Sequence, residues 1–243
     1  MKKLSLLAAC LITGITAHGA TVNWSAQVDA GFATSTGAAL AQGNYIRLGY
    51  FSISDAAVAA LADPTVGNVA TLNANFVQFG QTQVGDTFAI DGFFQTSSVF
   101  SYASNPTFDF TRQIYMWVLK ASNNSTLGAA LGSVTEQAIF YEPFGVAGSS
   151  PNKAEWQFPA SDIATAKAPD IGDAKTSLGG VYLAGSFVAS NAALTAINSG
   201  NPTGAVQLQA ASGGPPPVPE PSTLAVGFLT VLAAAGARRR RRA

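Results

Sequence analysis

The stretch Gln113-Ile-Tyr-Met-Trp-Val-Leu-Lys120 indicates the fold class most clearly. Its side chains fall into two alternating sets, which is the period of two expected when successive residues of a strand point to opposite faces. One face would carry Ile114, Met116, Val118 and Lys120, and the other Tyr115, Trp117 and Leu119. A strand of this kind predicts a sheet that packs against a second layer.

The rest of the chain between Thr21 and Gln209 repeats this character. Short apolar runs rich in Val, Ile, Phe, Tyr and Thr are separated by Gly, Asn, Asp, Ser or Pro, which is typical of strands and turns. The sequence therefore predicts an all-β domain over residues 20–212, an antiparallel β-sandwich or jelly-roll-like fold. We expect further strands near Thr21–Val28, Tyr45–Ser52, Asp86–Phe94, Gln137–Glu142, Ala154–Phe158, Val181–Val188 and Ala205–Gln209.

Three short helices are expected between these strands. Asp55–Ala62 has Ser54 in the capping position and ends before a proline, and Asn191 can cap a helix that ends at Ile197. A third helix is expected at Leu72–Phe79. The helices are thus predicted as small insertions in a β domain.

The N-terminus predicts a secretory signal peptide over residues 1–19. Two lysines precede a short apolar run from Leu4 to Ile15, and Ala17 and Gly19 are small residues at the positions required for a cut after Gly19. Leu7-Ala8-Ala9-Cys10 offers an alternative, a lipobox whose cysteine would become lipidated. The apolar run continues past Cys10, which favours the cut after Gly19.

The C-terminus has three parts in a fixed order. Residues 213–222 form a proline-rich linker, which predicts an extended, solvated spacer. The apolar segment from Thr223 to Ala237 would be about 22 Å long as a helix, shorter than the ~30 Å hydrocarbon core, and suits a transient anchor in the inner membrane. The last residues before Ala243 are Arg238, Arg239, Arg240, Arg241 and Arg242, which are expected to stay cytoplasmic.

The motif Val218-Pro219-Glu220-Pro221-Ser222, followed by the short apolar segment and the arginine cluster, resembles the PEP-CTERM sorting domain. The resemblance implies recognition by an exosortase-type enzyme, processing near the Pro-Glu-Pro tripeptide, and release to or attachment at the outer cell surface. It also implies association with exopolysaccharide and biofilm. An ordinary single-pass tail anchor is the alternative, although it leaves the proline-rich linker unexplained.

The charge distribution argues against nucleic acid as a partner. Seven of the thirteen basic residues lie in the two terminal segments, so the body between Ala20 and Pro217 keeps six basic residues against twelve acidic ones. Binding to phosphates depends on clustered Lys and Arg, which this body lacks. The resemblance to the PEP-CTERM proteins implies an extracellular polysaccharide as the partner instead.

The residue types also limit the chemistry of the mature protein. The single cysteine, Cys10, and the single histidine, His18, lie in the segment that export is expected to remove. Without them there is no Ser-His-Asp or Cys-His nucleophile and no common zinc, copper or iron ligand set. We therefore expect a surface or matrix protein that is not an enzyme.

A carboxylate-dependent glycan-active enzyme is the alternative function. Glycoside hydrolysis needs two carboxyl groups about 5 to 9.5 Å apart. An open groove with two facing carboxylates would favour this alternative, whereas isolated surface acids would favour the structural role. The candidate pairs are Asp86 with Asp91, Glu136 with Glu142, and Glu155 with Asp162.

Calcium is the one cofactor for which the sequence offers ligands. Hard cations take Asp, Asn and carbonyl oxygens, which the loops Asp170-Ile-Gly-Asp173 and Asn105 to Asp109 supply. Most strand aromatics are expected in the core. Trp156, in the polar setting of Lys153 to Gln157, is the candidate for an exposed sugar-stacking ring.

Overall fold

A computed structural model describes residues 19–26, 29–101, 107–143, 153–161, 165–201 and 203–211. Ala17, the sorting motif, the apolar segment that follows it and the five arginines lie outside these ranges, so what we expect of them stays a prediction. Within these ranges no helix is both long and apolar enough to cross a membrane.

The described residues are mostly β structure, which confirms the all-β class. The strands are β1 Ala20–Ala26, β2 Ala30–Ala33, β3 Tyr45–Phe51, β4 Phe76–Gln83, β5 Phe94–Phe100, β6 Tyr115–Ala121, β7 Val134–Tyr141, β8 Val181–Ala184, β9 Ser186–Val188, β10 Gly204–Gln207 and β11 Gln209–Ala210. The helices are α1 Asp55–Ala62, α2 Val69–Ala74, α3 Leu127–Leu131 and α4 Ala192–Ile197, with short 3₁₀ turns at Lys153–Trp156 and Thr176–Leu178.

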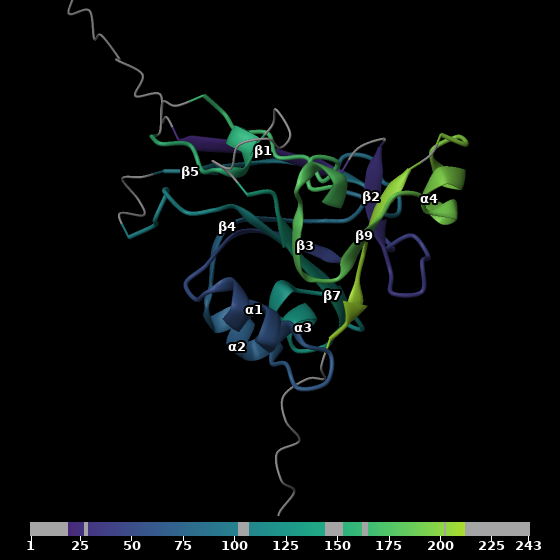
Figure 1. Cartoon of the computed structure of the whole chain (residues 1–243), viewed down its shortest axis with the longest axis horizontal. Coiled ribbons are helices and arrows are strands. Elements are labelled where there is room, and N and C mark those ends of the chain that lie inside the picture. Colours follow the sequence, from purple (N-terminus) through teal and green to yellow (C-terminus); the bar gives the residue numbers. More distant parts are fainter. Residues whose placement is uncertain are drawn as a thin grey trace, which may run out of the picture.

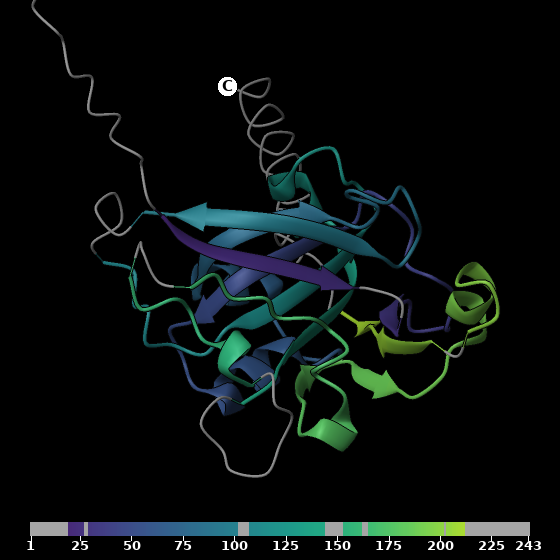
Figure 2. The same ribbon diagram turned by 90° about the horizontal axis from the view of Figure 1, so that it is seen from above.

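The strands form one large sheet and two small ones. The large sheet has the order β11-β7-β6-β3-β4, with β8 also paired to β7, so β4 is an end strand of this sheet. β1 and β5 form an antiparallel pair, and β10 pairs in parallel with β2 and antiparallel with β9. The β1–β5 pair lies on one side of the large sheet and α1, α2 and α3 lie on the other (Figure 1). Figure 2 shows the β1–β5 pair crossing over the strands of the large sheet.

β6, which contains most of the segment from Gln113 to Lys120, lies in the centre of the large sheet, between β3 and β7. Residues Ile114 to Leu119 are all buried. The Trp117 indole donates to Gln137 Oε1 at 3.1 Å, and Gln137 Nε2 in turn donates to the carbonyl of Ala62 in α1 at 3.4 Å. The alternation predicted from the sequence therefore directs the set of side chains that contains Trp117 toward the helices.

Two helix caps follow the prediction. Ser54 Oγ accepts from the Ala57 N–H, and α1 has the expected bounds. Asn191 Oδ1 accepts from the Leu194 N–H at the start of α4. Both caps are local, because the side chain satisfies backbone N–H groups of the first turn only.

Three predicted elements differ from the structure. Asp86–Phe94 is a turn-rich loop rather than a strand, because Gly85 and Gly92 have positive φ values, of 89° and 80°, and β5 begins only at Phe94. The helix expected to reach Phe79 ends at Ala74, and the chain continues as β4 because it pairs with β3. The strand expected at Ala154–Phe158 is largely the 3₁₀ turn that ends at Trp156.

Candidate functional site

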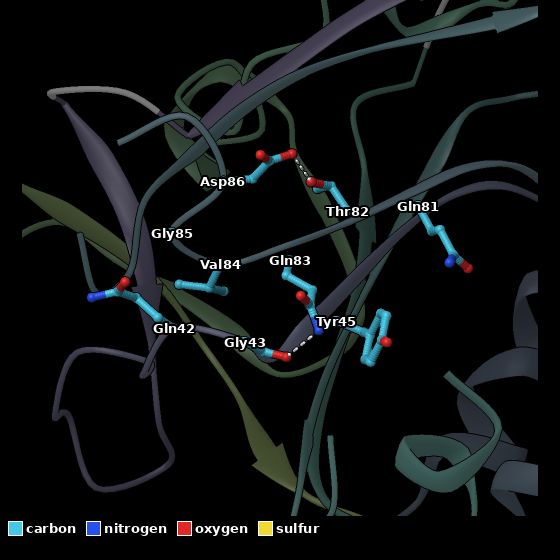
Figure 3. Close-up of a pocket in the computed structure, with 9 residues that line it drawn as sticks. All are labelled: Gln42, Gly43, Tyr45, Gln81, Thr82, Gln83, Val84, Gly85 and Asp86. Atoms are coloured by element: carbon cyan, nitrogen blue, oxygen red, sulfur yellow. Dashed lines mark hydrogen bonds between the residues drawn. The ribbon is translucent and has the colours of Figure 1, made fainter. Parts of the chain in front are cut away.

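A groove that opens to solvent lies where β3 begins and β4 ends. We call it the polar groove, and its volume is about 530 Å³ (Figure 3). Its nine lining residues are Gln42, Gly43, Tyr45, Gln81, Thr82, Gln83, Val84, Gly85 and Asp86. Three of the lining side chains are amides, two carry hydroxyl groups, and one is a carboxylate.

Strand pairing brings these residues together. In the antiparallel register of β3 and β4, Tyr45 lies opposite Gln83 and Arg47 lies opposite Gln81. Gln83 Nε2 donates to the carbonyl of Gly43 at 2.9 Å, which holds the segment before β3 against β4 (Figure 3). Because β4 is an end strand of the large sheet, its outer edge is not paired within that sheet, and Gln81 is exposed while Gln83 is half-buried.

The loop after β4 closes the other side of the groove. Asp86 Oδ2 accepts a hydrogen bond from the Thr82 hydroxyl. Asp91 Oδ1 accepts from the Gln42 N–H at 3.1 Å and from Gln42 Nε2 at 3.2 Å. Both carboxylates therefore hold the loop in place through hydrogen bonds to neighbouring side chains and backbone.

A buried guanidinium polarises one amide of the groove. Arg47 is 4% exposed and lies over the rings of Phe76 and Trp117, with its Cζ 4.5 and 4.9 Å from their centroids. Its Nε donates to Gln78 Oε1 at 2.8 Å, and Gln78 Nε2 donates to Gln81 Oε1 at 3.1 Å. These two hydrogen bonds run in series, and the charge of Arg47 polarises first the amide of Gln78 and then that of Gln81. The NH₂ group of Gln81 therefore becomes a stronger donor.

Burial lowers the pKa of Arg47 to about 10, because desolvation disfavours the charged form. The side chain stays charged at neutral pH. Its Nη1 also donates to the carbonyl oxygen of the Asn73 side chain, at 2.9 Å. The positive charge of Arg47 thus polarises the lining residue Gln81 through the neutral amide of Gln78.

The arrangement suits recognition of neutral, hydroxyl-rich ligands. Amides and hydroxyls each donate and accept hydrogen bonds, as sugar hydroxyls do. Tyr45 is half-buried and places an aromatic ring among these polar groups. Sequence reasoning missed this site, and the signal that was present is the repetition of glutamine in β4, at Gln78, Gln81 and Gln83.

The structure places the members of the three candidate carboxylate pairs differently. Asp86 and Asp91 belong to the same loop, but each is held by the hydrogen bonds described above. Glu136 and Glu142 are six positions apart along β7 and its end, which corresponds to about 20 Å of strand and is too far for a hydrolytic pair. Glu155 accepts from the Ala168 N–H at 2.7 Å, and Asp162 lies outside the described residues.

Glu136 is part of a separate contact. It forms an ion pair with Lys120 of the neighbouring strand and accepts from the Ser35 N–H at 2.6 Å. These bonds tie the loop after β2 to the large sheet. Glu136 therefore has a structural role.

The aspartate loop proposed for calcium is closed by its own hydrogen bonds. Asp170 Oδ1 accepts from the Gly172 N–H at 2.8 Å, and Asp170 Oδ2 accepts from Ser25 Oγ at 2.5 Å. Nearby, Lys175 forms an ion pair with Asp29 at 2.7 Å. No group of three His, Cys, Asp or Glu residues suited to a metal is found in the described part of the chain. Asn105 lies outside that part, and calcium binding stays a prediction.

Replacing Asp170 tests this closed loop through its pH dependence. Burial raises the pKa of Asp170 from 3.8 to about 6, so the folded state holds a proton that the unfolded state has released. The wild type should therefore lose up to about 3 kcal/mol of stability as the pH rises from 4 to 6. Asp170→Asn should lack this loss, because an amide does not titrate, while its oxygen can still accept from the Gly172 N–H and keep the loop in place. Urea unfolding at several pH values measures the difference.

Asp63→Asn is the matched control with the opposite sign. Hydrogen bonds from the Thr65 hydroxyl, the Thr65 N–H and the Val66 N–H lower the pKa of Asp63. This carboxylate stabilises the fold above the unfolded pKa, and that contribution is lost as the pH falls through the folded pKa. If the difference in free energy of unfolding between the wild type and Asp170→Asn does not change with pH, Asp170 does not hold a proton in the folded state.

The aromatic residues lie largely in the core, as expected. Trp24 and Trp117 are buried, and Trp24 packs edge-on against Phe94 with ring centroids 5.2 Å apart. The expectation that Trp156 is exposed is wrong. Its side chain is fully buried and lies 6.0 Å from the ring of Phe140, because the 3₁₀ turn directs it inward.

The fold and the groove define an all-β protein with a polar groove that opens to solvent. A scan against protein-family models found no match for the chain, and searches among curated proteins and solved structures likewise found no similar protein. The functional argument therefore rests on the residues themselves.

Proposed function

We propose that this protein is an exported, exosortase-sorted cell-surface or matrix protein that binds a neutral extracellular polysaccharide in the polar groove and is not an enzyme. The observation that carries the proposal is the lining of the groove, where amides and hydroxyls surround one half-buried tyrosine. The single carboxylate among the lining residues, Asp86, is bonded to Thr82.

The chemistry of the groove favours a sugar polymer over charged ligands. The lining side chains bring no cation and only one anion, so there is little to attract a strongly charged partner. The Tyr45 ring offers an apolar surface for the C–H face of a sugar, while Gln81 and Gln83 offer hydrogen bonds. Because the groove opens to solvent, a long chain can lie across it without threading.

The two ends of the sequence support export. The expected mature N-terminus, Ala20, is the first residue of β1 and is buried, so the signal peptide would be removed without cutting into the sheet. The proline-rich linker begins after β11, the last described strand, and would hold the sorting motif away from the fold. The β1–β5 pair over the large sheet supports a β-sandwich-like description of the domain.

Binding measurements test the groove. Gln81→Ala should weaken polysaccharide binding about five- to fifteen-fold, because the hydrogen bond lost is worth about 1 to 1.5 kcal/mol. Gln207→Ala is the matched control, since this amide lies in β10 and does not line the groove. Isothermal titration with neutral glucans and with anionic alginate gives both affinity and ligand class.

Three results would overturn the proposal. If no neutral or anionic polysaccharide binds, the groove is not a glycan site. If the protein instead releases new reducing ends from a glycan, and Asp86→Asn abolishes that release, the alternative of a carboxylate-dependent enzyme replaces it. Equal affinity of Gln81→Ala and Gln207→Ala would place binding outside the groove.

A further inference from the structure

A second concave site is lined in part by the loop between β4 and β5, which also borders the polar groove. We call it the apolar pocket, and its volume is about 410 Å³, within the range of roughly 300–1,000 Å³ that is usual for small-molecule sites. Its lining residues are Ala26, Phe88, Ile90, Phe93, Gln95, Ile197 and Asn198. They come from the end of β1, the loop before β5, the start of β5, and the C-terminal end of α4.

Exposed apolar side chains are concentrated at this pocket. Phe88 and Ile90 are each 39% exposed and Ile197 is 40% exposed, whereas Ala26 and Phe93 are buried beneath them. Large exposed hydrophobic residues are few in the described part of the chain, and these three are among six. An exposed apolar cluster of this kind usually marks a binding site.

The backbone is strained at the same places. The non-glycine residues with positive φ in the described ranges are Thr87, Ala89 and Ser199, at 69°, 51° and 54°. Thr87 and Ala89 flank Phe88, and Ser199 directly follows Asn198, so each strained residue is next to a lining residue. Strain of this type persists where the surrounding structure enforces it, and it gathers at ligand sites.

Hydrogen bonds hold the strained loop in place. The Gly85 N–H donates to the carbonyl of Phe93 at 2.7 Å, and the Ala89 N–H donates to the carbonyl of Gly85 at 2.6 Å. The Thr87 hydroxyl donates to the carbonyl of Gln95 at 2.6 Å. The loop is therefore fixed from both ends, with Phe88 and Ile90 exposed.

The lining defines the class of ligand. No residue that lines the apolar pocket is charged, so a charged ligand would lose its hydration without gaining an ionic partner. Gln95 is exposed, and its side-chain amide has no hydrogen-bond partner among the described residues, so it can bond one polar group of a ligand. Asn198 is already engaged, with Nδ2 donating to Thr203 Oγ1 at 3.1 Å.

We propose that the apolar pocket binds a small, neutral, largely apolar molecule with one hydrogen-bonding group that meets Gln95. A second copy of the chain is a weaker occupant, because three half-exposed side chains supply far less than the roughly 800 Å² per partner that a stable interface buries. This site is independent of the polysaccharide proposed for the polar groove.

Photo-crosslinking of the full chain with a neutral diazirine-bearing naphthalene tests the site. Mass spectrometry should find the label on peptides that contain residues 85–95 and 192–201. The double variant Ile90→Gln/Ile197→Gln should reduce this labelling about tenfold or more, because it removes apolar contact from two walls. Val66→Gln/Leu178→Gln is the matched control, since both residues are exposed and lie outside the pocket. Labelling of the apolar terminal segments is common to all variants and serves as the internal reference.

Two outcomes would overturn the inference. One is labelling of residues 85–95 and 192–201 that the pocket variant reduces no more than the control variant does. The other is sedimentation of the wild type as a dimer that Ile90→Gln/Ile197→Gln converts to a monomer, which would assign the surface to a second copy. Circular dichroism of each variant ensures that a loss of labelling is not a loss of fold.

Discussion

The Gly49→Ala variant is expected to lose about 3 kcal/mol or more of its free energy of unfolding. A Cβ atom at Gly49 would lie 2.3 Å from the carbonyl oxygen of Val77 and 2.7 Å from the ring of Phe76. The register of β3 against β4 shifts between Leu48 and Gly49, so the backbones approach closely at this point. The site lies in the middle of β3, where the strand is paired on both sides.

Neither neighbour can move aside at small cost. Val77 is fixed by its pairing with Tyr50 in β3. The Phe76 ring packs against Phe51 at 4.9 Å and against Trp117 at 5.5 Å, and it also lies beneath the Arg47 guanidinium. Displacing it would disturb the chain of bonds that reaches Gln81, so polysaccharide binding should weaken together with stability.

Gly128→Ala is the control for this prediction. Gly128 lies in α3, and a Cβ there would meet only Thr126 Oγ1, at 3.9 Å. Alanine in a helix is favoured over glycine by about 0.8–1 kcal/mol, so this variant should be slightly more stable than the wild type. Urea unfolding gives both values, and a cost below about 1 kcal/mol for Gly49→Ala would contradict the close approach at the bulge.

Elements governed by local signals were predictable from the sequence. The caps at Ser54 and Asn191 are each satisfied within one turn, so α1 and α4 begin where the sequence indicates. β6 was predictable because its alternation is strong and it lies at the centre of the sheet. In such cases the local preference and the tertiary environment agree.

Elements decided by distant partners were not predictable. The segment Phe76–Gln83 has apolar residues at spacings that suit either a helix or a strand. It forms a strand because it pairs with β3. Of the residues in the 3₁₀ turn at Lys153–Trp156, only the tryptophan favours strands, and the described chain there makes a single bridge, between Gln157 and Gln113. Sequence periodicity over five residues carries too little information to separate these outcomes.

The candidate sites were harder to predict than the fold. Residues Gln42 and Asp86 meet at the polar groove only because β3 and β4 pair in one register. Glutamine has no metal-binding or catalytic signature, so its repetition in β4 does not by itself predict a site. The apolar pocket combines four separate segments, and its strained residues are visible only in the backbone angles.

Replacement of Pro219, Glu220 and Pro221 by alanine is expected to abolish processing of the tail in a host that has an exosortase. The wild type should yield a mature protein that begins at Ala20 and lacks the apolar segment and the five arginines. The triple variant should keep the whole tail and fractionate with the inner membrane. The reason is that the enzyme loses its recognition element while the anchor remains. Intact-mass analysis of the soluble and membrane fractions measures both ends of the chain at once.

The same linker supplies a matched control, because Pro215, Pro216 and Pro217 can be replaced by alanine while the tripeptide is kept. That variant has a less rigid spacer but an intact recognition element, so it should be processed at both ends like the wild type. A requirement for Pro219–Pro221 alone would show that the residues are recognised, whereas equal loss in both variants would show that only the stiffness of the spacer matters. If the Pro219–Pro221 variant is shortened and released like the wild type, the resemblance to a sorting signal has no functional meaning. The apolar segment and Arg238 to Arg242 would then act as a plain hydrophobic anchor.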